Sequence, residues 1–224
     1  MDRRFAALIV LQGMDTSGKD GTIKHVFTGI NPQGCQVTSF KQPSKEELAH
    51  DFLWRIEKAL PERGDLGIFN RSQYEDVVVV RVHELVPKKV WSRRYQAIND
   101  FERRLADEGT AILKFFLYIG KDEQKERIRA RVSDPKRRWK FTQADIDERR
   151  YWKDYQRAYE DAIRECSTPH APWYVVPSNH KWYRNYVVAN AIVKTLSKLG
   201  LKLPRTDGDP NLPIFHIHVR SKSA

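Results

Sequence analysis

The chain has 224 residues, 40% of them hydrophobic and 31% charged, which fits one soluble α/β domain and leaves little length for a second. No apolar run reaches the roughly 18 residues that span a bilayer, and we find no secretory signal. Two cysteines are too few for a disulfide framework. We therefore expect a cytoplasmic protein. Forty Lys and Arg against 29 Asp and Glu give a net charge of +11, which predicts a polyanionic partner: nucleic acid, an anionic membrane or a phosphate polymer.

Apolar runs of strand length alternate along the chain with segments of helical period, a pattern typical of a parallel sheet wrapped by helices. Strands are expected at 5–11, 35–40, 66–69, 111–119 and 173–176. The chain from residue 203 onward is rich in proline and should form a surface tail, in which the apolar patch 214–219 could add a strand.

The sharpest motif is GMDTSGKD at 13–20, which has the spacing of a Walker A phosphate loop between an apolar strand and a helix. Its glycines let backbone N–H groups point at phosphate oxygens, the next helix presents its positive end, and Lys19 adds a mobile charge. Asp20 stands where Ser or Thr normally gives a hydroxyl to magnesium. We therefore expect a different metal arrangement, with Asp15 as the substitute ligand.

A capping box predicts the start of a helix after the second strand. Ser44 and Glu47 have the required spacing, and Pro61 should help to end the helix. The apolar residues that follow the box at helical spacing are Leu48, Phe52, Ile56 and Leu60.

The strand at 66–69 runs into a polar stretch, where P-loop proteins place the carboxylate of the Walker B strand. Asn70 holds that position here, and its neutral amide is a weaker magnesium ligand than a carboxylate. Arg71 should point at the same phosphates. Glu75 and Asp76 lie on the next helix, where they could serve a metal or substrate or pair with a nearby arginine.

Helical spacing of apolar residues, together with helix caps such as Thr142 with Asp145 and Gly200, predicts four helices in the second half of the chain. The first places Ile98, Phe101 and Leu105 on one face and stops near Gly109. The others are expected at about 122–132, 142–165 and 182–199.

The helix at 122–132 and the loop after it carry clustered basic residues. Arg127 and Arg131 share a helix face, whereas Arg129 should face solvent. In nucleotide-type kinases a lid in this part of the chain closes over the phosphates, and its arginines stabilise the charge on the transferring group. We expect that role here, the alternative being a solvated charged helix. The basic residues of the loop are Arg137, Arg138 and Lys140.

Two stretches mix aromatic and charged residues, 151–155 and 182–186. They could stack on a nucleobase, but helical spacing favours packing in the core. His216 and His218 lack the partners of a metal site.

Four of these pieces together resemble the polyphosphate kinase 2 family: QGMDTSGKD at 12–20, IFNRSQYED at 68–76, SDPKRRWKF at 133–141 and WKDY at 152–155. The resemblance runs from about residue 5 to residue 199 and is greatest to the branch that phosphorylates both nucleoside mono- and diphosphates. It implies a P-loop kinase fold similar to thymidylate kinase: a three-layer sandwich with a five-stranded parallel sheet and a helical lid at about 127–165. A single domain would cover 1–202, followed by a tail at 203–224.

The resemblance also implies substrates, a cofactor and functional residues. It implies Mg²⁺ as cofactor, inorganic polyphosphate and adenine or also guanine nucleotides as substrates, and a homodimer or homotetramer with neither a membrane nor a specific nucleic-acid partner. The residues expected in catalysis are Asp15, Lys19, Arg71 and Arg131. Those expected to bind phosphate or nucleotide are Gly13, Thr16, Ser17, Gly18, Asp20, Lys24, Asn70, Glu75, Arg127, Arg137, Arg138 and Lys140. The expected magnesium ligand is Asp15, with Glu75 or Asp76 as a second.

The residues fit this chemistry. When polyphosphate donates to ADP or AMP, the nucleophile is an anionic phosphate oxygen, so the reaction needs charge compensation and alignment rather than a general base. We expect the P-loop to hold the reacting end of polyphosphate, a basic groove to hold its tail, and the nucleotide to lie under the lid. Candidates for the groove are Lys24, Lys41, Lys88 and Lys89.

Two other functions stay open. An ATP-dependent nucleotide kinase would share the loop and the lid, but the missing hydroxyl after Lys19 and the high basicity fit it poorly. A nucleic-acid-binding P-loop protein would show salt-sensitive affinity without phosphotransfer, and the sequence offers no groove-reading motif to support it.

Overall fold

The computed structural model describes residues 3–202. The predicted tail, the apolar patch at 214–219 and the pair His216 and His218 lie outside the described residues. Within residues 3–202, no helix is long and apolar enough to cross a membrane.

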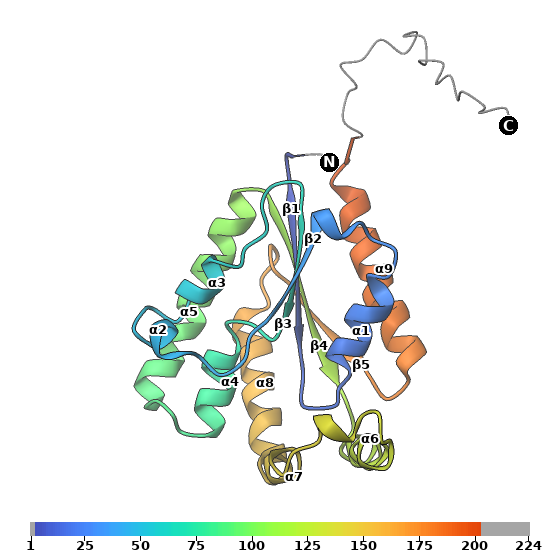
Figure 1. The fold of residues 1–224 in the computed structure, drawn as a ribbon. Helices are drawn as coiled ribbons and strands as arrows, with labels where there is room; N and C mark the ends of the chain where they lie inside the picture. Colours follow the sequence, from blue (N-terminus) through green and yellow to red (C-terminus); the bar gives the residue numbers. More distant parts are fainter. Residues whose placement is uncertain (1–2, 203–224) are drawn as a thin grey trace, which may run out of the picture.

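Five parallel strands form one sheet in the order β2-β3-β1-β4-β5 (Figure 1). The strands are β1 (Ala6–Gln12), β2 (Cys35–Ser39), β3 (Leu66–Asn70), β4 (Thr110–Tyr118) and β5 (Trp173–Pro177). Every residue of the central strand β1 is buried, as expected for a parallel strand covered on both faces. The predicted α/β class and all five strands are confirmed, with ends shifted by one residue at most.

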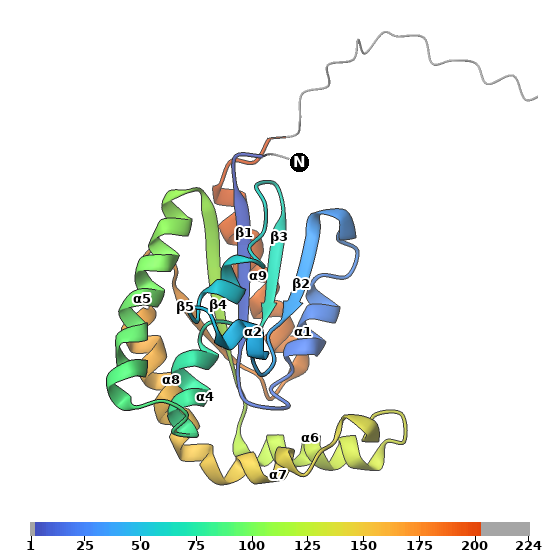
Figure 2. The same ribbon diagram turned by 60° about the vertical axis from the view of Figure 1, so that its left-hand side comes forward.

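Helices cover both faces of the sheet and complete the three layers (Figures 1 and 2). The helices on one face are α1 (Lys19–Val26) and α9 (Lys181–Lys198). Those on the other are α4 (Glu75–Val82), α5 (Lys88–Asp107) and α8 (Trp152–Cys166). Two further helices, α6 (Lys121–Ser133) and α7 (Ala144–Asp147), lie beyond the carboxyl ends of the strands (Figure 2). The site is built between these ends and α6.

The prediction of one continuous helix after Ser44 is wrong. The capping box is present, since Ser44 Oγ accepts from the Glu47 N–H at 3.2 Å and Glu47 Oε2 from the Ser44 N–H at 2.7 Å. The chain nevertheless forms two short helices, α2 (Lys45–Leu48) and α3 (Trp54–Glu57). Asp51 separates them because its carboxylate accepts the Leu53 N–H at 2.9 Å, a local turn that competes with the helix.

The predicted helix at 142–165 is also interrupted. A 3-10 helix, Glu148–Tyr151, stands between α7 and α8. In this tighter turn Glu148 approaches His83, the residue after α4, at 3.1 Å, and Arg149 donates to Gln124 of α6 at 2.6 Å. The turn thus joins the expected lid segment to both sides of the site.

Candidate active site

The site forms where β1 and β3 end side by side. Leu11 of β1 pairs with Asn70 of β3, so the phosphate loop and the Asn70–Arg71 segment leave the sheet at the same edge. Ligands bind at the carboxyl ends of the strands in open parallel sheets.

The phosphate loop requires glycine at two positions. Gly13 has φ +148°, and a Cβ there would lie 2.7 Å from the Leu117 carbonyl oxygen and 2.8 Å from Ser17 Oγ. Gly18 has φ +104°, and its Cβ would lie 1.9 Å from Arg184 Nη1. An alanine at either position would both clash and adopt a disfavoured backbone conformation. Thr16 also has a positive φ, +60°, so the backbone of the loop is held in a curled form.

Lys19 lies folded inside the loop. Its ammonium donates to the carbonyl oxygens of Gly13 at 2.6 Å and Met14 at 3.3 Å. Burial, assisted by the nearby Arg71 guanidinium, lowers the Lys19 pKa to about 8. A bound anion would favour the charged form of this side chain, so the loop is suited to phosphate.

Arg71 follows β3 with a left-handed backbone, φ +67°. Its Nη2 donates to Asp15 Oδ1 at 3.0 Å and its Nη1 to Glu75 Oε2 at 3.0 Å. The guanidinium therefore bridges the phosphate loop and the start of α4. This position places Arg71, as expected, beside the phosphate loop.

Two of the three candidate metal ligands lie at this bridge. Asp15 and Glu75 flank Arg71, whereas Asp76 turns away to Arg55 at 3.5 Å and Arg94 at 3.3 Å. No group of three or more His, Cys, Asp or Glu that could hold a metal ion is found within the described chain. Mg²⁺ typically takes one or two carboxylates together with substrate phosphates and water, so Asp15 and Glu75 fit it and Asp76 is not brought to the site.

Asn70 and Asp20 contact each other at the ends of the two motifs. Asn70 Nδ2 donates to Asp20 Oδ1 at 2.8 Å. Lys140, from the loop after α6, approaches Asp20 Oδ2 at 3.9 Å. The unusual residues at the two positions are thus partners in one hydrogen bond.

A cationic cleft of about 580 Å³ opens from the phosphate loop toward α6 and α9. The acidic residues that line it are Asp15 and Asp20. The basic residues that line it are Lys19, Lys24, Arg71, Arg127, Arg131, Arg137, Lys140, Lys181 and Arg184. Such an excess of cations in a cleft concentrates polyanions there.

Arg127 holds the phosphate loop itself. Its guanidinium donates to the carbonyl oxygens of Thr16 at 3.0 Å and Ser178 at 2.5 Å and to Glu123 at 2.8 Å. With its donors engaged in this way, Arg127 is suited to fixing the backbone that binds phosphate. Arg129 faces solvent and pairs with Glu126.

Other expected cations are divided between the cleft and the surface. Arg131 pairs with Asp145 at 3.4 Å and Arg137 with Asp134 at 3.1 Å, both at the cleft. Arg138 donates to the Val132 carbonyl oxygen and does not line the cleft. Lys41 lines a neighbouring pocket beside Asn70, whereas Lys88 and Lys89 begin α5 and line neither.

Sequence reasoning missed Arg184 and Lys181, which α9 contributes to the cleft. Arg184 is 3% exposed, its Nη1 lies 3.3 Å from the Ser17 carbonyl oxygen, and within residues 3–202 it has no carboxylate partner. Burial and the nearby Arg127 lower its pKa to about 10. The available signal was a basic pair three residues apart at the start of a helix that follows a strand.

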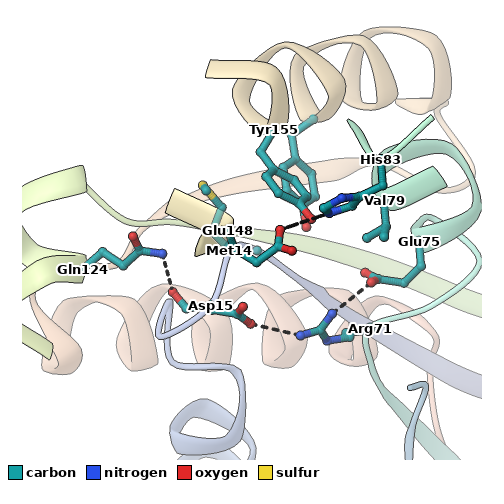
Figure 3. Close-up of a pocket in the computed structure, with 11 residues that line it drawn as sticks. Met14, Asp15, Arg71, Glu75, Val79, His83, Gln124, Glu148 and Tyr155 are labelled. Atoms are coloured by element: carbon teal, nitrogen blue, oxygen red, sulfur yellow. Dashed lines mark hydrogen bonds and ion pairs between the residues drawn. The ribbon is translucent and has the colours of Figure 1, made fainter. Parts of the chain in front are cut away.

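A second pocket, of about 190 Å³, adjoins the cleft at Asp15 and Arg71 (Figure 3). Gln124 Nε2 donates to the Asp15 carbonyl oxygen at 3.0 Å, and the Tyr155 hydroxyl donates to Glu148 Oε2 at 2.8 Å. The apolar and aromatic residues that line it are Met14, Val79, His83, Tyr155 and Tyr159. We call it the aromatic pocket.

Core packing was expected for both aromatic stretches. In the first it holds for Trp152 but not for Tyr151, which is 40% exposed, and in the second it fails. Trp152 is buried, whereas Tyr155 lines the aromatic pocket. Trp182 and Tyr186 are 72% and 62% exposed, because the apolar face of α9 that meets the sheet is formed by Val188 and Ile192.

Known proteins resemble this chain over most of its length. The family model described as polyphosphate kinase 2 matches residues 2–202. The "AMP/ADP-polyphosphate phosphotransferase" of Meiothermus ruber is 56% identical over 200 residues, 89% of this chain and 75% of that protein. The "ADP-polyphosphate phosphotransferase" of Rhodopseudomonas palustris is 49% identical over 215 residues, 91% of this chain and 74% of that protein. The crystal structure of polyphosphate kinase 2 from Arthrobacter aurescens TC1 matches with a TM-score of 0.90 and 50% identity, covering 92% of this chain and 73% of that one.

Proposed function

Because this chain belongs to the polyphosphate kinase 2 family, we propose that it transfers phosphoryl groups reversibly between inorganic polyphosphate and both AMP and ADP. It is a phosphotransferase, and its relatives are named for polyphosphate and for AMP or ADP. The observation that carries the proposal is the meeting of two unlike pockets at Arg71, one cationic and one aromatic. The two alternative functions, an ATP-dependent nucleotide kinase and a nucleic-acid-binding protein, do not explain why the chain belongs to a family of polyphosphate kinases.

Each pocket suits one substrate. The cationic cleft fits polyphosphate, because its lining supplies positive charge from the phosphate loop to α9. The aromatic pocket lies under the 3-10 helix and α8 and offers Tyr155 and Met14 to a base. In this arrangement the nucleotide phosphate and the end of polyphosphate meet beside Arg71.

The side chains at the meeting point compensate charge and align the reactants. Lys19 exchanges its contacts with Gly13 and Met14 for the phosphate that is transferred. Arg71 keeps its position through Asp15 and Glu75, and Arg131 approaches from α6. An attacking phosphate oxygen is already anionic, so these groups hold and neutralise rather than remove a proton.

The family points to a divalent metal, and we propose magnesium. Asp15 would hold it, with Glu75 as a second ligand. When bound there, Mg²⁺ would supply positive charge that offsets the negative charge developing on the transferred phosphate.

The proposal also covers the oligomeric state, the nucleobases accepted and the cellular compartment. Trp182, Tyr186 and Val193 are exposed along α9, and such a patch supports a contact between subunits of a homodimer or homotetramer. Guanine nucleotides are proposed as additional substrates. The free thiols Cys35 and Cys166 fit the reducing cytoplasm.

The test is a direct assay with purified protein. Magnesium and long-chain polyphosphate are mixed separately with AMP, ADP, GMP or GDP, and nucleotides are followed by chromatography. We expect ADP from AMP and ATP from ADP, and loss of both with Lys19→Ala. Phosphorylation by ATP but not by polyphosphate would overturn the proposed donor.

A further inference from the structure

The backbone that carries Arg71 has an unusual conformation for a residue with a long side chain. Its φ of +67° lies in the left-handed region, which costs free energy for any residue except glycine. Such a conformation persists where the surrounding structure enforces it. The turn at residues 71–74 must therefore be held by its neighbours.

A buried carboxylate lies directly behind this turn. Glu102 of α5 is fully buried, and its Oε1 accepts hydrogen bonds from Gln73 Nε2 at 3.0 Å and from the Tyr74 hydroxyl at 2.9 Å. Its other oxygen, Oε2, accepts from Lys114 Nζ of β4 at 2.5 Å. One oxygen of Glu102 is thus engaged by the turn and the other by the sheet.

Lys114 completes a closed network. It is also fully buried, and it donates to the Tyr74 hydroxyl at 2.8 Å and to the Cys166 carbonyl oxygen at 2.7 Å. Burial raises the pKa of Glu102 and lowers that of Lys114, while their mutual attraction opposes both shifts. A buried ion pair of this kind is often no more stabilising than apolar side chains of similar volume, so stability alone does not account for it.

A second set of bonds holds the same turn from the phosphate-loop side. Ser72 Oγ accepts from Gln12 Nε2 at 3.1 Å and from the Tyr74 N–H at 3.3 Å. The Tyr159 hydroxyl donates to Gln12 Oε1 at 3.3 Å. Each of the three residues after Arg71 is therefore bonded to a buried side chain.

We propose that Gln73, Tyr74, Glu102 and Lys114 are positioning residues that hold the turn at 71–74 and thereby fix the Arg71 guanidinium between Asp15 and Glu75. The inference rests on the proposed function, since Arg71 stands where the two substrates would meet. None of the four residues lines the cationic cleft or the aromatic pocket. They act on the reaction through Arg71.

The first test removes the two bonds between the turn and Glu102, together with the bond from Lys114 to the Tyr74 hydroxyl. It leaves the ion pair between Glu102 and Lys114 in place. In Gln73→Met/Tyr74→Phe, side-chain volume is nearly kept. We expect kcat to fall about 10- to 100-fold, as for small misplacements of aligned groups, while KM for ADP changes less than about threefold. The matched control is Ile98→Val, which loosens the same buried cluster without removing a hydrogen bond of the turn. Ile98→Val should keep its kcat even if its Tm falls as much as that of Gln73→Met/Tyr74→Phe. Equal losses of kcat in the two variants would overturn the inference.

A mutant cycle asks whether the effect passes through Arg71. Arg71→Lys lacks the forked guanidinium that reaches two carboxylates. In this background the network can no longer improve the rate by positioning that group. We expect Gln73→Met/Tyr74→Phe to cost less than about threefold in that background. The same 10- to 100-fold loss in both backgrounds would show that the network acts independently of Arg71.

A crystal structure of Gln73→Met/Tyr74→Phe gives a readout that does not need activity. We expect Arg71 to leave the left-handed region or to lose its contacts with Asp15 and Glu75. An unchanged turn would overturn the inference. If the parent protein transfers no phosphate, the proposed function fails, and this structure still decides whether the network positions Arg71. If the double variant does not fold, Tyr74→Phe alone replaces it in the kinetic tests and in the crystal structure.

Discussion

Asp20 and Asn70 exchange the chemistry that P-loop proteins usually place at the ends of their two motifs. The hydroxyl expected on the loop is replaced by a carboxylate, and the carboxylate expected on the strand is replaced by an amide. The two replacements are joined by a hydrogen bond from Asn70 Nδ2 to Asp20 Oδ1 at 2.8 Å. One negative charge is kept, but it lies on the loop side of the pair.

This exchange predicts a compensating double variant. Asn70→Asp alone places two carboxylates in contact, and their repulsion should lower kcat/KM for ADP about tenfold. Adding Asp20→Ser restores a donor and one charge, so the double variant should return to within about threefold of the parent. The measurement is initial rate against ADP at fixed polyphosphate. A double variant as slow as the product of its single variants would contradict the pairing.

Asp15 should set the magnesium requirement. Asp15→Asn removes a charged oxygen ligand, and we expect the magnesium concentration for half-maximal rate to rise about tenfold. Asp76→Asn is the control, because Asp76 pairs with Arg55 and Arg94 away from the cleft, and its magnesium titration should not change. If Asp15→Asn leaves the titration unchanged, Asp15 is not a metal ligand.

Lys19 predicts a coupling between polyphosphate binding and protons. Its pKa of about 8 in the free protein leaves it about half charged at pH 8, and a bound polyanion raises that pKa. Binding at pH 8 should therefore take up about half a proton, and affinity should fall as pH rises above 8. Calorimetry of tripolyphosphate binding in buffers of different ionisation heat measures the uptake. Lys19→Met should abolish it, and uptake that persists in this variant would assign the proton elsewhere.

At the scale of elements, α9 joins the sheet to the phosphate site. Val188 and Ile192 of α9 pack on the sheet, and this packing fixes the first turn of the helix beside the phosphate loop. Arg184 is held there, buried without a carboxylate partner in residues 3–202. Its hydrogen bonds go to Asn185 Oδ1 and to the Ser17 carbonyl oxygen, which do not neutralise its charge. A buried charge of this kind costs stability unless an anion binds to it.

Arg184→Met should therefore separate stability from function. We expect Tm of the free protein to rise by a few degrees, since about 1 kcal/mol shifts Tm by about 2–4 °C in a domain of this size, and KM for polyphosphate to rise at least about tenfold. Arg129→Met is the control, because Arg129 is exposed and paired within α6. The measurements are thermal melts with and without polyphosphate and a KM series. A variant with lower Tm and unchanged KM would make Arg184 purely structural.

The elements show what the sequence could predict. Apolar runs were enough for β1, β3 and β4, because burial on both faces of a parallel sheet leaves a strong local signal. The more exposed strands β2 and β5 were placed by shorter apolar stretches. The breaks after Leu48 and at Glu148–Tyr151 depend on the Asp51 cap and on bonds to His83 and Gln124, which helical spacing does not reveal. The loop residues of the candidate site follow from a contiguous motif. Arg184 does not, because tertiary packing alone brings it to the loop.

At the scale of the whole molecule, the net charge of +11 is not spread evenly around the site. The cationic cleft is lined by basic residues from the phosphate loop, α6 and α9, whereas the aromatic pocket is lined by Asp15, Glu75 and Glu148. The two pockets share Asp15 and Arg71, so substrates of different chemistry can approach one point from two sides. Because the two pockets differ in charge, the binding of each substrate should depend differently on salt concentration.

Salt should therefore weaken polyphosphate binding more than nucleotide binding. Between about 50 and about 200 mM salt, we expect KM for polyphosphate to rise at least about tenfold and KM for ADP less than about threefold, because screening acts on many contacts in one case and few in the other. Lys24→Met/Lys181→Met removes two cations of the cleft and should flatten the polyphosphate slope while leaving the ADP slope unchanged. Equal slopes for the two substrates would mean that both bind through the same charges, and the division between the two pockets would then fail.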